Sequence, residues 1–307
     1  MSYKVSLNLG GGGARGLAHI GVLRALEENE VEVDILIGVS MGALVAANYA
    51  YFKNARKVEN RIVSHIESDR FKRTLLGTWR PGNSEDYVSR SKRLLMKFSR
   101  LYRQTEVYSR LFLTMGMLDK DDVAEAVLPI IPPVNFEDLK MPFACVAVNL
   151  ENGLRRIFNH GSVQTAVTAS LSIPLVFPPV EINGNLYTDG GIVDRVGVDS
   201  ANDIGVRKII AVDVSSDFFA RKKIKTALDI MLRSEEISAK YRQNYQLRQA
   251  AIVIRPIQES IHWADYHNYE NIIQSGYDST IEKIKEIKKV ARSGRSFLRI
   301  FSRSKSA

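Results

Sequence analysis

Cysteine is the residue type that this 307-residue chain has least of, because Cys145 is its only one. A lone thiol cannot form an intramolecular disulfide, and the apolar run around it predicts a buried side chain. A secreted scaffold held together by disulfides is therefore excluded. We expect a cytoplasmic protein in a reducing compartment.

Long apolar runs and metal-ligand patterns are also missing. The most apolar segment, residues 35–52, is interrupted by glycines, a serine and an asparagine, so it predicts a strand followed by a helix and not a transmembrane span. The N-terminus has no basic segment followed by a long apolar one, and we expect no signal peptide. Because the sequence has no HExxH motif, EF-hand loop or His/Cys/Asp/Glu cluster with ligand spacing, we expect neither a metal nor another cofactor.

Acidic residues are too few to balance the basic ones. The 43 Lys and Arg outnumber the 34 Asp and Glu, which gives a net charge of +9. Residues 90–110 and 288–307 concentrate this surplus. Each segment is either a solvated surface or an amphipathic element that contacts the inner face of an anionic membrane peripherally. Because no nucleic-acid-binding motif accompanies the charge, we expect no nucleic acid partner.

Strand and helix signals alternate along the chain. Residues 4–9 and 34–39 are short β-rich runs, and residues 14–28 and 41–52 have the apolar pattern of buried helices. This alternation predicts an α/β fold with a mainly parallel sheet. Later strands are expected at residues 143–150, 154–159, 208–214 and 250–255, a hairpin at 180–187, and helices at 162–170, 226–247 and 268–291.

The chain divides into one main domain and a tail. The domain is expected to cover residues 1–288, and residues 289–307 form a basic C-terminal tail. Residues 53–122 are charged and lack strand signals, so they predict a helical insertion that could act as a lid.

A G-x-S-x-G motif lies between an apolar strand and an apolar helix. Gly38 and Gly42 flank Ser40 at two positions on either side. A sharp strand-to-helix turn leaves little space around the serine, so glycines relieve the crowding and the hydroxyl projects at the helix N-terminus. This context favours Ser40 as a nucleophile over a serine in an ordinary turn.

A glycine-rich loop, residues 10–16, follows the first strand and opens the first helix. Such a loop lets backbone amides converge on a negative charge. One interpretation is an oxyanion hole for an ester attacked by Ser40. The amides expected to form it are those of Gly11, Gly12, Gly13 and Met41.

The same loop also satisfies the G-x-G-x-x-G pattern of dinucleotide-binding proteins. Glu32 or Asp34 would then be the acidic partner of the ribose. This second interpretation leaves Ser40 unexplained, so we disfavour it.

Asp189 is the candidate base. It follows the predicted hairpin and precedes Gly190 and Gly191. A carboxylate at a strand end with two flexible glycines behind it can approach Ser40, although the pattern alone is typical of a turn aspartate. Arg15 either orients the glycine loop, contacts a phosphate head group or lies on a helix surface.

Four segments together resemble bacterial patatin-like phospholipases, and they occur in the order of that family. They are the glycine-rich opening motif at residues 9–23, the nucleophile motif at 38–42, the segment at 169–180 and the Asp-Gly-Gly motif at 189–191. The resemblance covers roughly residues 4–215. It implies a mixed α/β/α sandwich and a Ser40–Asp189 dyad, without histidine, that hydrolyses acyl esters of lipids as a phospholipase A, lysophospholipase or esterase.

One element departs from the family pattern. Where the family usually has Asn-x-Pro after Asp-Gly-Gly, this chain has Asp194-Arg195-Val196-Gly197. The shape of that loop is therefore open, as is an inactive, lipid-binding alternative with the same fold. His19 and His160 lack an acidic partner in sequence and are expected to be a polar helix residue and a strand-end residue.

Overall fold

The computed structural model describes residues 3–76, 115, 118–215, 224, 226–257 and 261–295. Its strands, in chain order, are β1 (Val5–Leu9), β2 (Ile35–Val39), β3 (Phe143–Asn149), β4 (Arg155–Phe158), β5 (Val180–Ile182), β6 (Asn185–Asp189), β7 (Lys208–Val212) and β8 (Ile252–Ile254). Its α-helices are α1 (Ala18–Glu28), α2 (Met41–Phe52), α3 (Ala55–Ile66), α4 (Asp69–Phe71), α6 (Lys120–Ala126), α7 (Val163–Leu171), α8 (Val198–Asp203), α9 (Ala227–Leu247), α10 (Tyr269–Glu282) and α11 (Ile284–Arg295).

Short helical turns connect several of these elements. The 3-10 turns are η1 (Gly13–Leu17), η3 (Leu128–Ile130), η4 (Phe136–Asp138) and η5 (Gly190–Ile192), and η2 (Lys72–Leu76) is a π-helical turn.

The described strands form one mixed sheet of eight strands. Five of them run parallel in the order β3-β2-β1-β7-β8, as expected for strands joined by helical crossovers. β4 and β6 pair with β3 in the antiparallel direction, and β5 extends the sheet beyond β6. The predicted mainly parallel α/β fold is confirmed.

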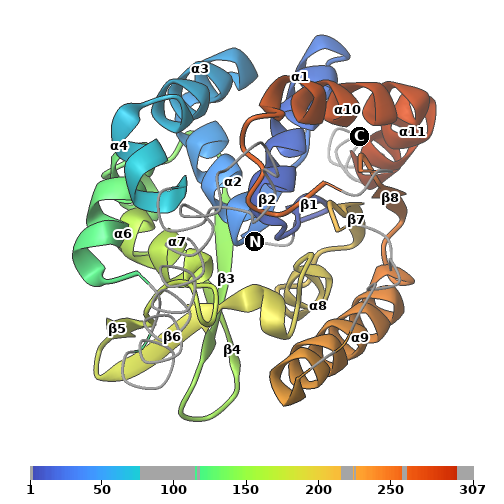
Figure 1. Ribbon diagram of the computed structural model, residues 1–307. Helices are drawn as coiled ribbons and strands as arrows, with labels where there is room; N and C mark the ends of the chain where they lie inside the picture. The colour runs from blue at the N-terminus through green and yellow to red at the C-terminus, as the bar shows by residue number, and fades with distance from the viewer. Residues whose placement is uncertain are drawn as a thin grey trace, which may run out of the picture.

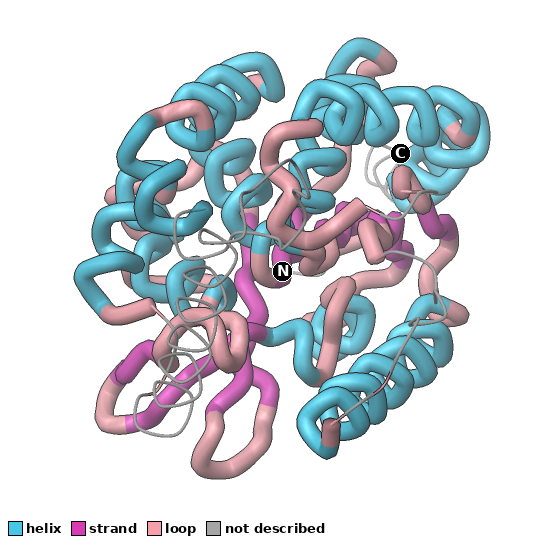
Figure 2. The backbone as a smooth tube through the Cα atoms, in the orientation of Figure 1, coloured by secondary structure: helices cyan, strands magenta, loops and turns pink. Residues whose placement is uncertain are grey.

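Helices cover both faces of the sheet, as the ribbon and tube views show (Figures 1 and 2). Along β2, Leu36 joins the larger hydrophobic cluster with α1, α2, α3, α7, α10 and α11. Ile37 and Val39 point to the opposite face and pack with Val198 of α8 and Leu247 of α9. Successive strand residues point to opposite faces, so fully apolar strands with helices on both sides make three layers.

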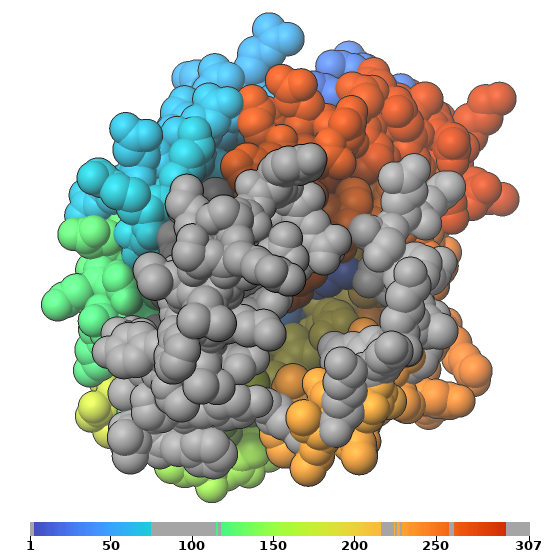
Figure 3. Space-filling view, viewed as in Figure 1, coloured from blue at the N-terminus to red at the C-terminus, as the bar shows by residue number. Residues whose placement is uncertain are grey.

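In the space-filling view, helices of the two layers occupy different parts of the visible face. α10 and α11 lie at its upper right, and α9 forms its lower right edge (Figure 3). Within the described residues, no helix is both long enough and apolar enough to cross a bilayer.

The predicted insertion and tail lie partly outside the described residues. Of residues 53–122, the structure describes α3, α4, η2 and α6, and the basic segment 90–110 is not among the described residues. α11 crosses the predicted domain boundary at residue 288 and packs Ile287 and Ala291 into the core. Residues 296–307 also lie outside the described part.

Candidate active site

Ser40 lies at the turn between β2 and α2 with a backbone conformation that side chains rarely adopt. Its φ is 54° and its ψ is −127°. Such strain is typical of a nucleophile held at the start of a helix. A Cβ atom at Gly42 would overlap the carbonyl group of Leu9, and one at Gly38 would overlap the backbone of Ala43. Both glycines are therefore required by the tight approach of β1, β2 and α2.

The pairing of β3 brings Asp189 to Ser40. Val39, the last residue of β2, pairs with Val146 of β3, and Asp189, the last residue of β6, pairs with the next residue, Ala147. β4 occupies the other edge of β3 beside both positions. β2 and β6 therefore meet end to end along one edge of β3, and the residues at their ends face each other.

The Ser40 hydroxyl lies close enough to the Asp189 carboxyl group to lower its pKa. Asp189 also accepts the backbone N–H of Gly191 at 2.7 Å. Burial raises the pKa of Asp189 to about 6, although the Ser40 hydroxyl, the Gly191 N–H and the charge of Arg195 favour the ionised form. A carboxylate with this pKa is a stronger base than an exposed aspartate and is still ionised at neutral pH.

Ser170 of α7 fixes the turn from behind, and sequence reasoning did not identify it. Its hydroxyl accepts the backbone N–H of Ser40 at 2.9 Å and donates to the Val146 carbonyl at 2.7 Å. Ser170 is fully buried. It thus joins the nucleophile turn to β3 at the point where β2 ends. The only sequence signal was its position in the segment 169–180.

The glycine loop lies beside Ser40, but its amides are not equivalent. The N–H of Gly11 donates to the Arg195 carbonyl at 2.9 Å, so this arrangement leaves it no role in binding an oxyanion. Gly12 precedes η1 and Gly13 begins it, and Met41 begins α2. Amides at these positions have no acceptor within their own helix. Of the four amides predicted for an oxyanion hole, those of Gly12, Gly13 and Met41 therefore remain candidates.

His19 is a polar residue of helix α1, as the sequence predicted, and it supports the loop from inside the protein. Its side chain is fully buried, and Nε2 lies 2.8 Å from the Gly10 carbonyl. Burial lowers the pKa of His19 to about 4, so the ring is neutral and Nε2 donates to that carbonyl. His19 therefore holds the start of the glycine loop.

Arg15 lies near the end of the glycine-rich loop, and its side chain turns back toward Gly12. Its Nε donates to the Gly12 carbonyl at 3.2 Å. Burial and the nearby charge of Arg195 lower the pKa of Arg15 to about 10, which still leaves it charged at neutral pH. Of the roles considered for Arg15, this contact favours orientation of the loop.

An apolar pocket opens next to Ser40. The space between its atoms, counted with the open solvent at its mouth, is about 830 Å³. Apart from Ser40 and Gly13, every described lining residue is apolar or aromatic, among them Leu44, Ile130, Phe177 and Trp263. The described wall has no charged side chain, so the pocket suits a hydrocarbon chain.

The residues of the other interpretations lie away from this arrangement. Asp34 accepts the backbone N–H groups of Lys4 and Val5, at the end of β1 opposite the glycine loop. It cannot reach a ribose held by that loop. His160 is exposed and contacts Asn159. Among the described residues, no group of three or more His, Cys, Asp or Glu side chains could hold a metal ion.

Comparisons with known proteins give the same family signal. The family model described as patatin-like phospholipase matches residues 7–202. The lysophospholipase NTE1 of Pyricularia oryzae is 32% identical over 212 residues, which cover 69% of this chain and 12% of that protein. An uncharacterized NTE family protein of Mycobacterium tuberculosis is 31% identical over 214 residues, covering 70% of this chain and 50% of its own.

The chain spans half or less of the length of these curated relatives. Among solved structures, VipD from Legionella pneumophila is similar over 96% of this chain and 67% of its own, with a TM-score of 0.47 and 15% sequence identity.

Proposed function

The chain belongs to the patatin-like phospholipase family, and from that premise we propose that it hydrolyses fatty acyl esters of lipids, with Ser40 as nucleophile and Asp189 as base. The observation that carries the proposal is that Ser40, which lines an apolar pocket, lies beside the buried Asp189 carboxyl group where β2 and β6 end on β3. The strained turn and the glycine amides supply the other parts that such a reaction needs.

The reaction has two stages. Asp189 takes the hydroxyl proton while Ser40 Oγ attacks the ester carbonyl carbon, and the amides near Gly12, Gly13 and Met41 stabilise the oxyanion. The intermediate expels the alcohol, which receives the proton from Asp189, and an acyl-enzyme remains on Ser40. Water then attacks the acyl group while Asp189 takes its proton; the bond to Ser40 Oγ breaks, Oγ takes this proton back from Asp189, and the fatty acid leaves.

The substrate is a lipid with at least one long acyl chain. The pocket next to Ser40 is lined by described residues without charge, so the acyl chain enters it and the alcohol part of the ester stays outside. Phospholipids and lysophospholipids both meet this condition.

Peripheral membrane contact is also part of the proposal. In α11 the apolar side packs on the core, whereas Lys285, Lys289 and Arg292 are exposed along the opposite side. Together with the basic segments 90–110 and 288–307, this surface attracts anionic lipid. Such contact brings the enzyme to a substrate that lies in the inner face of a membrane.

Labelling with a fluorophosphonate probe tests the assignment of the dyad. Wild type is expected to be labelled at Ser40 and to release fatty acid from lysophospholipid, and Ser40→Ala is expected to do neither. Removal of the nucleophile typically costs about 10⁴-fold or more in turnover. Labelling at another residue, or turnover by Ser40→Ala, would reject the dyad. Ser172→Ala is the matched control, because it removes a buried hydroxyl directly after α7 that donates to the Thr168 carbonyl.

A further inference from the structure

The loop after Asp189 and its two glycines joins both halves of the candidate site. The N–H groups of Val193 and Asp194 donate to the Gly190 carbonyl at 3.1 and 3.0 Å. The carbonyl of the next residue, Arg195, accepts the N–H of Gly11 at 2.9 Å. A shift of this loop would therefore move the glycine loop relative to Asp189.

Asp194 gives this loop a buried charge. The side chain is fully buried, and Oδ2 accepts the backbone N–H of Ser200 at 2.8 Å and its hydroxyl at 2.7 Å. Oδ1 has no hydrogen-bond partner among the residues that the structure describes. Burial raises the pKa of Asp194, and the Ser200 bonds and the charge of Arg155 oppose this effect. The ionised carboxylate thus depends on its neighbours.

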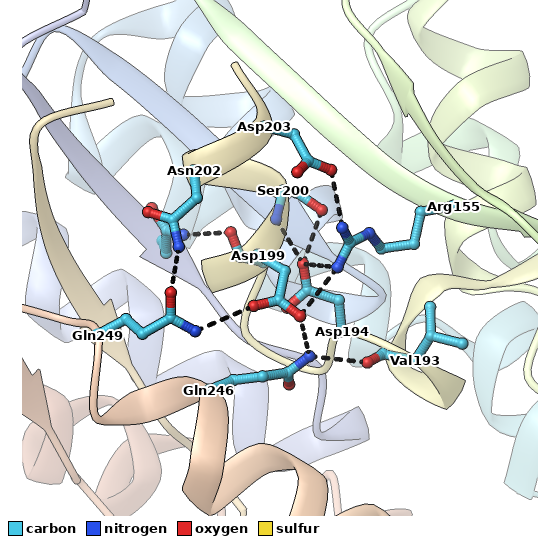
Figure 4. A network of polar contacts seen from close by, with 11 residues as sticks. Arg155, Val193, Asp194, Asp199, Ser200, Asn202, Asp203, Gln246 and Gln249 are labelled. Atoms are coloured by element: carbon cyan, nitrogen blue, oxygen red, sulfur yellow. Dashed lines mark hydrogen bonds and ion pairs between the residues drawn. The ribbon is translucent and has the colours of Figure 1, made fainter. Parts of the chain in front are cut away.

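Arg155 of β4 is the cation at this place, and three carboxylates surround it (Figure 4). Its guanidinium lies 3.0 Å from Asp199, 2.7 Å from Asp203 and 3.7 Å from Asp194. Two of these carboxylates belong to α8 and the third to the loop. Removal of Arg155 would leave three negative charges together, one of them fully buried.

The same cluster reaches the loop by a second route. The side-chain amide of Gln246 in α9 donates to the Val193 carbonyl at 3.0 Å and to Asp199 at 2.6 Å (Figure 4). Arg155 and Gln246 therefore both contact Asp199 Oδ2. The loop, α8, α9 and β4 form one connected unit on the face of the sheet opposite the pocket helices.

We propose that Arg155 is a positioning residue for the hydrolysis reaction. By balancing Asp194, Asp199 and Asp203 it holds the loop 193–197, so that the Arg195 carbonyl keeps Gly11, and with it the Gly12 and Gly13 amides, in place beside Ser40. This inference rests on the proposed function. Arg155 is absent from the pocket lining, so it acts through the loop and not by contact with substrate.

The expected effect is on turnover and not on substrate binding. Loss of a single oxyanion-hole donor costs about 10²–10³-fold in kcat, and a loosened loop should cost part of that, about tenfold or more. The acyl pocket keeps its described lining, so KM should change less than about threefold. Without Arg155 the pKa of Asp194 rises further. Because a protonated Asp194 no longer repels Asp199 and Asp203, the kcat of the variant relative to wild type should rise as pH falls.

Steady-state hydrolysis of a soluble short-chain ester by wild type and Arg155→Met tests this inference. Arg156→Met is the matched control, because Arg156 is the next residue of β4, on its other face, and contacts the Phe158 ring at 5.6 Å. We expect lower kcat with nearly unchanged KM in Arg155→Met, partial recovery in Arg155→Lys and no change in Arg156→Met. If Arg155→Met does not fold, kcat and KM of Arg155→Lys are compared with those of Arg156→Lys instead.

The same substitution in a second mutant background distinguishes a positioning role of Arg155 from an effect on stability alone. Asp194→Asn removes the buried charge at constant shape, so the loss of kcat caused by Arg155→Met should be smaller in that background. Folded Arg155→Met with a lower Tm but wild-type kcat and pH profile would overturn the inference, as would an equal loss in both backgrounds. Absence of turnover in wild type would instead reject the proposed function.

Discussion

Replacement of Asp189 by asparagine should make the protein more stable while it removes activity. Asp189 is buried, and its pKa is raised from 3.8 to about 6 in the folded protein. Between these two values the folded state binds a proton that the unfolded state has lost. Wild-type stability therefore falls as pH rises through this window, and ionised Asp189 is a cost to folding above it.

The size of this cost follows from the shift in pKa. A difference of two units corresponds to about 3 kcal/mol at pH 8, where both states are ionised. At pH 5 the folded carboxyl group is mostly protonated, and the same linkage gives about 1.5 kcal/mol. The asparagine side chain of the variant is neutral at both pH values and can still accept the N–H of Gly191. Asp189→Asn should thus exceed wild type in Tm by a few degrees at pH 8 and by less at pH 5.

Thermal unfolding at both pH values, followed by circular dichroism, measures the difference directly. Asp121→Asn on α6 is the control, because Asp121 is exposed and its replacement should change Tm equally at both values. In parallel, kcat/KM of wild type should decline below about pH 6, to roughly a tenth of its plateau at pH 5. The reasoning would be refuted if Asp189→Asn had a lower Tm than wild type at pH 8. It would also be refuted if the difference in Tm between the two proteins did not narrow toward pH 5.

Two further predictions concern the support of the nucleophile and the route to the membrane. Ser170→Ala removes the hydroxyl that binds the buried N–H of Ser40 and the carbonyl of Val146. Steady-state kinetics should therefore show kcat lowered about tenfold or more, with KM nearly unchanged. A wild-type kcat in this variant would contradict the role of Ser170. Deletion of residues 296–307 removes Arg299, Arg303 and Lys305, each of which contributes about 1 kcal/mol to binding at an anionic surface. In a sedimentation assay, the affinity for phosphatidylserine vesicles should therefore fall up to about 100-fold. Hydrolysis of a soluble ester should stay unchanged. Equal vesicle binding after the deletion would remove the tail from the proposal.

The sequence predicted the central layers well because apolar runs and their periods depend on local patterns. The expected strands at 4–9, 34–39 and 143–150 agree with β1, β2 and β3 to within one residue. The helix at residues 268–291 was predicted as one, but α10 ends at Glu282 and α11 begins at Ile284. An amphipathic pattern does not reveal a break that keeps both halves packed on the same core.

Features that depend on distant contacts could not be predicted in the same way. The short helix α8 was missed because six residues are too few for a periodic signal. The use of the Gly11 amide by Arg195, and the cluster around Arg155, arise only where the loop after Asp189 crosses the end of β1. No spacing in the sequence indicates these pairings, because their partners come from separate elements.

The geometry of the dyad depends on strand register and not on the length of chain between its members. β2 and β6 run toward each other and stop at Val146 and Ala147, adjacent residues of β3. A shift of either strand by one residue would turn its side chains to the opposite face of the sheet. Ser40 and Asp189 can therefore meet only if both strands keep their pairing with β3. Ser170 supports this register because its hydroxyl binds both the Ser40 N–H, just after β2, and the Val146 carbonyl of β3.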